Sequence, residues 1–254
     1  MRASRQLLWF AASLGVLVLL LAGWQLLADA RVLPRAFFPG PDLTWRALQR
    51  GFVGGTMLED TFTTLRRLAL GWALASVIGV GLGAIVGTSA WARAWVAPMF
   101  EALRPLPASA IAPVAMLLLG LTDAMILALI AFGAVWPMLL TTVHGFSSIH
   151  PRRLEVAQSL GLSRMEFIAK VALPGAMPDI LGGLRLGLTV ALILVVVGEM
   201  ITVQGGLGSS ILLSARAFNA PGIFAGIAVL GVIGLVTNGL LAMVETYALR
   251  WQRR

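Results

Sequence analysis

Long apolar runs are the feature that most constrains how this chain folds. Of its 254 residues, 59% are hydrophobic and only 12% are charged, which is about half the charge of a soluble domain. The apolar residues gather into stretches of roughly twenty, the length that lets an α-helix cross a bilayer core of about 30 Å. Because backbone polar groups in lipid must bond within their own segment, these runs predict an all-α polytopic membrane protein.

Six membrane spans are expected. They cover Leu7–Ala28, Leu68–Thr88, Ala108–Leu121, Ala124–Val143, Leu184–Val203 and Gly222–Val244. Proline removes a helix hydrogen bond, so broken spans occur where neighbouring groups or a cavity satisfy the backbone. Pro107 and Pro113 are expected to interrupt the third span, and Trp136-Pro137 the fourth. These residues are candidates for the lining of a pathway, with irregular packing as the alternative.

The arginine residues predict the orientation of the spans. With both termini cytoplasmic, twelve basic residues lie inside and seven outside, which is the bias that cytoplasmic segments carry. The exceptions include Arg66 and Arg67, at the outer end of the second span. The net charge of +8 is scattered around span ends and forms no single stripe. Membrane-flanking arginine therefore explains it better than nucleic-acid binding does.

The chain is expected to divide into three parts. Residues 1–58 hold the first span and an outer segment, with a short surface helix over 42–50 that Asp42 caps. Residues 59–246 form the transmembrane domain, and 247–254 a cytoplasmic tail. Ala28 and Ala30 make an A-x-A pattern, but the apolar run before them is longer than a signal-peptide core. An uncleaved first span is therefore favoured.

Small residues recur every four positions in three of the spans. The positions are Gly79, Gly83 and Gly87, Gly183 and Gly187, and Gly222 and Gly226. In lipid such spacing lets helices pack backbone against backbone. The second span also reads like a nucleotide-binding glycine loop, but it lacks the strand–turn–helix context and a P-loop lysine. Helix packing is the favoured interpretation.

A polar stretch, Glu155–Pro174, lies between the fourth and fifth spans. His150-Pro151 is typical of a helix start, and Gly161 suits the left-handed residue that ends one. Ser163 with Glu166 three residues later indicates a capping box for a second helix, which Pro174 stops or bends. The stretch therefore predicts a cytoplasmic helical hairpin, which is typical of a docking surface.

Glu199 is the most conspicuous acid inside a span. A carboxylate in lipid is costly and usually faces a bundle interior or water. Glu199 could line a pathway, latch a gate, or bond to Arg216 or to backbone at the outer mouth; a structural tie between helices explains it equally well. Asp123 is expected to cap the fourth span. No cysteine is present, and the sequence shows no metal-ligand cluster and no catalytic residues.

The hairpin resembles the EAA loop of ABC importer permeases. That pattern reads EAA, three residues, G, nine residues, then I-x-L-P; here Val156 and Val171 replace one alanine and the isoleucine. Further likeness to the nitrate/sulfonate/taurine branch of the family lies in four motifs. They are Arg104-Pro105-Leu106-Pro107, Leu184-Arg185-Leu186, Val197-Gly198-Glu199-Met200 and Gly206-Leu207-Gly208.

The resemblance implies a type I ABC importer (MetI-like) permease fold of six helices in the bacterial plasma membrane. It implies a permease homodimer, a periplasmic or lipid-anchored binding protein, and separate ATPase subunits that hold ATP and Mg, so this chain needs no cofactor. The ATPase would dock on the coupling loop, residues 151–180. The residues expected to carry this docking are Glu155, Ala157, Gly161, Leu162, Leu173 and Pro174.

Two questions stay open. The solute is expected to be a nitrate-, sulfonate- or taurine-like anion, with an aromatic or pyrimidine-type compound as the alternative. A self-sufficient secondary transporter would usually show inverted repeats and several intramembrane acids. Neither is visible in the sequence, so the importer permease is favoured.

Overall fold

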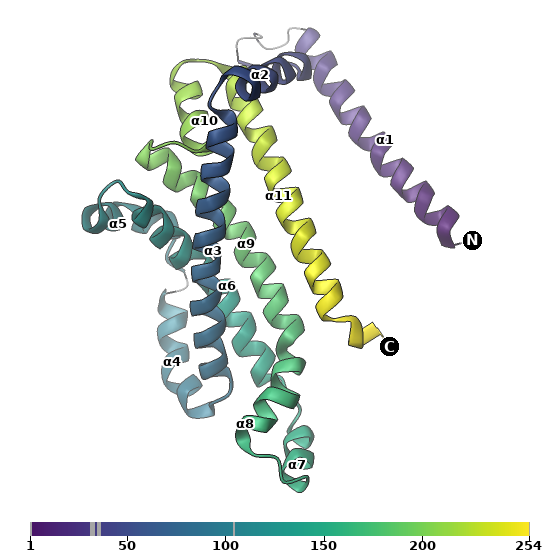
Figure 1. Ribbon diagram of the computed structural model, residues 1–254, viewed down its shortest axis with the longest axis vertical. Helices are drawn as coiled ribbons and strands as arrows, with labels where there is room; N and C mark the ends of the chain where they lie inside the picture. Colours follow the sequence, from purple (N-terminus) through teal and green to yellow (C-terminus); the bar gives the residue numbers. More distant parts are fainter. Residues whose placement is uncertain (1, 31–33, 35–36, 104, 254) are drawn as a thin grey trace.

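The computed structural model describes residues 2–30, 34, 37–103 and 105–253, and helices dominate it (Figure 1). Among these residues, four helices are long and apolar enough to cross a bilayer. They are α3 (Met57–Gly87), α6 (Asp123–Ser147), the continuous helix Arg164–Thr202 and α11 (Ala220–Ala248). A further helix, α1 (Arg2–Asp29), runs apart from the others and meets them only near its C-terminal end (Figure 1). The predicted all-α membrane fold is confirmed.

Helices α3 and α6 form the centre of the bundle and run parallel. A Cβ atom at Gly71 would meet Ile130, and one at Gly79 would lie 2.9 Å from the Cβ of Met138. The partner positions rise together along both helices, which is the register of a parallel pair. These contacts leave no room for a side chain on α3, so the predicted close packing through glycines is confirmed for this helix.

Because α3 and α6 run in the same direction, the chain between them must return from the end of α3 to the level at which α6 begins. It does so in pieces, as α4 (Ala90–Leu103), the 3₁₀ turn η1 (Ala108–Ile111) and α5 (Ala112–Leu119). The third span is therefore longer than predicted and starts at α4. Its tryptophans, Arg93 and Pro98 hide that helix from a search for apolar runs.

The prolines of this region sit at helix starts. Pro107 precedes η1 as its N-cap, and Pro113 lies in the first turn of α5, where a missing N–H costs nothing. They mark the ends of the break between helices, whereas the prediction placed them inside a span. Pro137 lies within α6, which continues through it, so the predicted interruption of the fourth span is wrong. Arg104 falls outside the described residues.

The fifth span runs antiparallel to α6 and reaches far beyond its predicted start at Leu184. It comprises α8 (Arg164–Phe167), a π-helical turn η2 (Ile168–Ala172) and α9 (Leu173–Thr202). Pro174 does not stop this helix, as one prediction had it. It sits in the first turn of α9, directly after the wider π turn, which accommodates the lost hydrogen bond.

Short helices complete the end of the bundle where α3 and α6 begin. These are α2 (Pro41–Gly54) and α10 (Leu207–Arg216); a 3₁₀ turn η3 (Arg250–Arg253) follows α11 at the other end. The surface helix predicted over 42–50 is present, but Gly40 occupies its N-cap and Asp42 lies in its first turn. Proline at the first helical position favours that start. Trp24 of α1 stacks on Phe224 of α11 there, with ring centroids 5.6 Å apart.

Candidate functional site

The hairpin between α6 and α9 forms one end of the molecule (Figure 1). Its first helix, α7 (Pro151–Ser159), starts where the His150 ring nitrogen Nδ1 accepts a hydrogen bond of 3.2 Å from the Arg152 N–H. It ends at Gly161, whose φ is +70°. The Leu162 N–H then donates to the Ala157 carbonyl at 3.0 Å, which completes a Schellman motif.

The second helix of the hairpin starts with the predicted capping box. Ser163 Oγ accepts from the Glu166 N–H at 3.3 Å, and Glu166 Oε2 accepts from the Ser163 N–H at 3.0 Å. Lys170 pairs with Glu166 at 2.9 Å. A helix of 39 residues spans roughly 58 Å, so this end lies beyond a 30 Å bilayer core. Outside the bilayer core, the pKa of Glu166 is lowered to about 2. The largest cause is the hydrogen bond from Lys170, followed by those from Ser163.

The docking candidates divide into exposed and buried positions. Glu155 and Leu173 are exposed, and a Cβ at Gly161 would meet no heavy atom within 4 Å. Leu162 and Pro174 are half-buried, whereas Ala157 is buried against the body of the protein. A recess of about 580 Å³ separates the hairpin from the turn between α3 and α4; Ala157 and Leu162 line it on the hairpin side, and Gly87 and Arg93 on the other.

Large apolar side chains cover the outside of the hairpin. Leu154, Val156, Leu160 and Met165 are all exposed, Met165 by 76%. They extend beyond the lipid-crossing part of the bundle, so the bilayer does not account for them. An exposed apolar group on a well-capped element is typical of a protein–protein interface.

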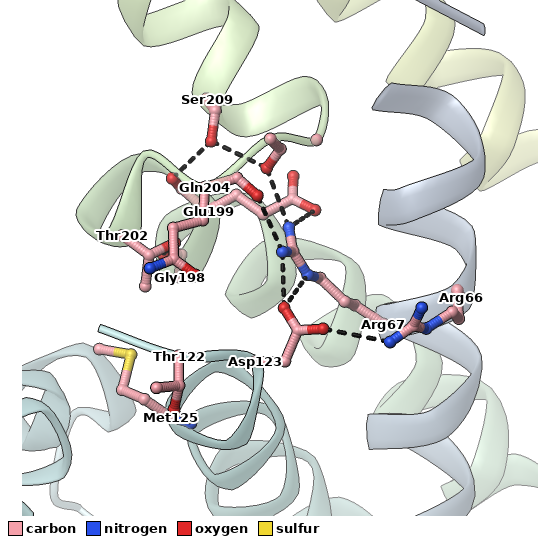
Figure 2. Close-up of polar contacts among 12 residues, drawn as sticks. Arg66, Arg67, Thr122, Asp123, Met125, Gly198, Glu199, Thr202, Gln204 and Ser209 are labelled. Atoms are coloured by element: carbon pink, nitrogen blue, oxygen red, sulfur yellow. Dashed lines mark hydrogen bonds and ion pairs between the residues drawn. The ribbon is translucent and has the colours of Figure 1, made fainter. Parts of the chain in front are cut away.

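At the opposite end, Arg67 of α3 is the centre of a buried polar cluster (Figure 2). Its Nε and Nη2 donate to Asp123 Oδ1 at 2.9 and 2.6 Å, and its Nη1 donates to Glu199 Oε1 at 3.2 Å. The remaining two N–H groups reach the carbonyls of Gln204 and Gly205 at 3.0 and 2.9 Å. All five guanidinium donors are therefore used, and one side chain joins α3, α6, α9 and the turn before α10.

Side chains from other helices cap the start of α10. The N–H groups of Gly206, Leu207 and Gly208 donate at 2.9 Å to Asp60, Thr64 and Glu199, respectively. Thr64 Oγ1 also lies 3.0 Å from both Glu199 oxygens. The Gly-Leu-Gly sequence offers no side-chain cap of its own, and a Cβ at Gly206 would collide with the Glu199 carboxylate.

The cluster also holds strained backbone. Val203, the residue after α9, has φ +53° and ψ +34°, the left-handed conformation that β-branched residues rarely adopt. The two residues that follow it are those whose carbonyls Arg67 binds. Such strain persists where the surroundings over-determine the conformation, and Arg67 provides that restraint here.

The cluster changes the interpretation of several predicted residues. The basic partner of Glu199 is Arg67, not Arg216, and backbone bonding to Glu199 is present through Gly208. Thr122 caps α6, since its side chain accepts from the Met125 N–H. The predicted cap, Asp123, instead binds Arg67 and, at 3.2 Å, Arg66.

Sequence reasoning placed Arg67 at the outer end of the second span without a role. Its burial was detectable in principle. Arg67 lies at the edge of an apolar run, and it is one of the basic residues on the outer side, against the bias of basic residues toward the cytoplasm. Asp60 and Thr64 precede it by seven and three residues, the spacing of one helix face. A stripe of polar residues entering an apolar helix was the missed signal.

The other pathway candidates lie elsewhere. Trp136, on α6, contacts Phe100 and Phe132 edge to face, and its indole N–H is buried without a hydrogen-bond partner among the described residues. A Cβ at Gly133, one turn before it, would lie 2.9 Å from the Cβ of Ala108 in η1. Pro107 therefore lies near Trp136. Asp123 of the cluster is thirteen residues earlier on α6, which is about 20 Å away along the helix.

The comparisons with known proteins agree with this geometry. Residues 76–247 match the family described as "Binding-protein-dependent transport system inner membrane component". The chain is 31% identical to the taurine transport system permease protein TauC of Escherichia coli, over 94% of this chain and 92% of that protein. It is 28% identical to the bicarbonate transport system permease protein CmpB of Synechococcus elongatus, over 82% and 75% of the two chains.

The fold matches a solved transporter as well. An inward-facing structure of the MetNI methionine ABC transporter superposes with a TM-score of 0.66 at 16% identity, over 75% of this chain and 95% of that chain. The chain thus belongs to the family of binding-protein-dependent transport system inner membrane components, and it is the permease subunit of an ABC importer whose ATPase and solute-binding protein are separate subunits.

Proposed function

We propose that this chain forms one half of a permease homodimer that admits a small anion to the bacterial cytoplasm, and that the ATPase docks on the α7–α8 hairpin. The observation that carries the docking role is the construction of the hairpin. Its caps are local, through His150, Gly161 and Ser163. Its large apolar side chains, by contrast, are left exposed by the described part of the chain. The hairpin therefore presents a preformed apolar surface that a partner protein could cover.

We assign a role in docking to each candidate residue. Glu155, Gly161 and Leu173 face outward and would touch the ATPase. Ala157 and Leu162 line the recess behind the hairpin and would set its distance from the body. Pro174 follows the π turn that joins the hairpin to α9, so it would shape the joint through which docking moves the bundle.

Gly161 gives the sharpest test of docking. Gly161→Ala and Gly161→Leu impose the same left-handed strain, and neither meets another atom of the chain at Cβ. We expect Gly161→Ala to keep most ATPase association in co-purification and Gly161→Leu to lose it, together with solute uptake. Equal retention by both variants would exclude Gly161 from the docking surface.

The orientation is proposed from the charge bias and the hairpin together. Both termini and the coupling loop 151–180 would lie in the cytoplasm, with residues 1–58 as an added span and outer segment, 59–246 as the transmembrane domain and 247–254 as a tail. The chain has no cysteine, so single cysteines report cleanly. A membrane-impermeant maleimide should label Phe37→Cys in spheroplasts and label Leu160→Cys only after lysis.

A small anion is the proposed solute. Support comes from the relatives named for taurine and bicarbonate transport and from exposed arginines at the proposed outer end, Arg66 and Arg216. Positive charge there would raise the local concentration of anions. Uptake of labelled taurine, an alkanesulfonate, nitrate and bicarbonate should be compared with that of a pyrimidine in cells that express the complete transporter. Preference for the pyrimidine would favour the alternative solute class.

Glu199 is proposed as a gate element that holds α10 closed, with Trp136, Pro107 and Pro113 lining the pathway deeper in the bundle. The indole N–H of Trp136, buried and without a hydrogen-bond partner among the described residues, would be a donor for an anion that reached it. Glu199→Gln should change the basal ATPase rate or uptake, whereas the matched change Glu245→Gln, in the partly exposed pair with Arg185, should not. A loss of protein stability alone would leave Glu199 as a tie between helices.

A further inference from the structure

The turn between α10 and α11 has the same hydrogen-bond pattern as the hairpin turn, but phenylalanine in place of glycine at its left-handed position. After α10, the Asn219 N–H donates to the Ser214 carbonyl at 2.8 Å and the Phe218 N–H to the Ala215 carbonyl at 3.1 Å. This is the Schellman pair of bonds that also ends α7. The left-handed position is Gly161 in the hairpin, with φ +70°, and Phe218 here, with φ +54°.

Phenylalanine is a poor choice for this backbone. A left-handed conformation brings Cβ close to the following carbonyl, so bulky residues are outliers there and glycine is usual. The ring does not repay this strain by packing within the chain, because Phe218 is 79% exposed. Strained residues that the fold does not need tend to mark ligand clamps and binding sites.

The surroundings of Phe218 fit a protein partner. Arg216 and Leu213 are exposed on the last turn of α10, and no ion pair or hydrogen bond of the Arg216 side chain occurs within the described part of the chain. A recess of about 450 Å³ opens beside the turn, lined in part by Arg50, Ser214 and Asn219. Aromatic residues, phenylalanine among them, and arginine are enriched at protein–protein interfaces.

We propose that Phe218 is the anchor by which the solute-binding protein docks, with its ring in an apolar socket of that protein and Arg216 against a carboxylate at the socket rim. The inference rests on the proposed function, because it requires this end to face outward. The end lies opposite the hairpin (Figure 1), and the buried cluster fixes the start of α10, so the turn is presented on a rigid base.

A lipid contact does not explain the strain. An aromatic side chain that anchors a helix in the headgroup layer needs no special backbone, and a regular helix can expose one, as α2 exposes Trp45. A partner protein with a defined socket requires the ring in one direction, and a rigid turn supplies that direction.

The experiment uses the complete transporter in lipid nanodiscs and the binding protein encoded with it. Phe218→Gly removes both ring and strain, Phe218→Ala removes only the ring, and Phe218→Trp keeps an aromatic anchor. We expect the first two to weaken the Kd for the binding protein about tenfold or more and Phe218→Trp to retain it. The apparent melting temperature should stay equal or rise for Phe218→Gly, and the basal ATPase rate should not change.

The control is Trp91→Ala, which removes an equally exposed aromatic residue (74%) from the hairpin end and should leave the Kd unchanged. An unchanged Kd in both Phe218→Gly and Phe218→Ala would overturn the inference and point to lipid or a second permease copy. A melting temperature that falls in Phe218→Gly would overturn it too, since the ring would then be structural. If the wild-type transporter fails to bind the binding protein, the proposed function itself fails.

Discussion

The helices of the hairpin and helix α10, at the opposite end of the molecule, are capped by opposite means. In the hairpin, the cap of each helix lies within a few residues of the group it satisfies: His150 serves Arg152, and Ser163 serves Glu166. At the other end, Gly206 and Leu207 depend on Asp60 and Thr64, which lie 146 and 143 positions away in the chain. Local caps let an exposed hairpin keep its shape without support from the rest of the bundle. Distant caps make α10 part of the bundle.

The largest effect should come from Arg67. Arg67→Met leaves buried Glu199 without its cation and half-exposed Asp123 with Arg66 alone. Breaking a buried pair costs about 3 to 5 kcal/mol. Denaturant titration in mild detergent should show this loss, with Arg67→Lys recovering only part of it because three donors cannot replace five. The control is Arg66→Met, 62% exposed at its side chain, which should stay within about 1 kcal/mol. Equal losses at both arginines would contradict the distinction between the two ends.

Gly206 comes next. Gly206→Ala places a methyl group into the Glu199 carboxylate at a φ of +95°, which should cost about 2 to 4 kcal/mol from overpacking and backbone strain. Gly182→Ala is the matched control on α9, with no heavy atom near its Cβ, and it should stabilise the helix by about 0.5 to 1 kcal/mol. The same titration compares them, and opposite signs are expected.

Ser163→Ala tests whether the hairpin is stabilised by its own local caps. Loss of the capping box should cost about 1 kcal/mol, which corresponds to roughly fivefold faster hydrogen exchange in the first turn of α8. Exchange at the start of α10 should not change, because the hairpin caps serve only the hairpin. Ser159→Ala, whose hydroxyl bonds within α7, is the control. A spread of the effect to α10 would show that the hairpin is not locally stabilised.

The smallest effect concerns pH. The pKa of Glu166 is lowered in the folded hairpin, so its contribution is complete above its ordinary value near 4.5 and is lost as pH falls from there toward about 2. Protection of the first turn of α8, corrected for intrinsic exchange rates, should be constant from pH 8 to about 5.5 and should decline below 4.5. Lys170→Met should bring the folded-state pKa of Glu166 back toward 4.5 and so reduce the protection lost on acidification, while the onset of the loss stays in place, since the Lys170 hydrogen bond is the largest cause of the shift. An unchanged loss would remove Lys170 from that role.

The same contrast explains what the sequence could predict. Gly161, Ser163 and Glu166 act on their neighbours, so the pattern alone indicates both hairpin helices and their caps. The partner of Glu199 could not be found this way, because Arg67 lies 132 positions earlier and Arg216 was nearer in the chain. Only the parallel packing of α3 on α6 brings Arg67 to Asp123.

Several predicted helix boundaries were wrong for a related reason. The α4 helix contains Arg93 and Pro98, so its sequence does not read as a span; the direction of α3 and α6 is what requires it to run back. Pro174 was expected to end a helix, which local rules favour, but a π turn keeps the helix continuous. Thr122 and Asp123 are both good caps, and Arg67 determines which of them is free for that role.

The helix Arg164–Thr202 joins the two ends in a single rod. Glu199, near one end, is held in the cluster, and α7 of the hairpin is connected at the other end, Arg164, about 53 Å away at 1.5 Å per residue. A rod pinned at one end acts as a lever: a tilt of about 10° around Glu199 carries the hairpin through roughly 9 Å. Small rotations at the buried cluster and large displacements at the hairpin would then be one movement, with η2 as the point where the hydrogen bonding changes from α-helical to π-helical.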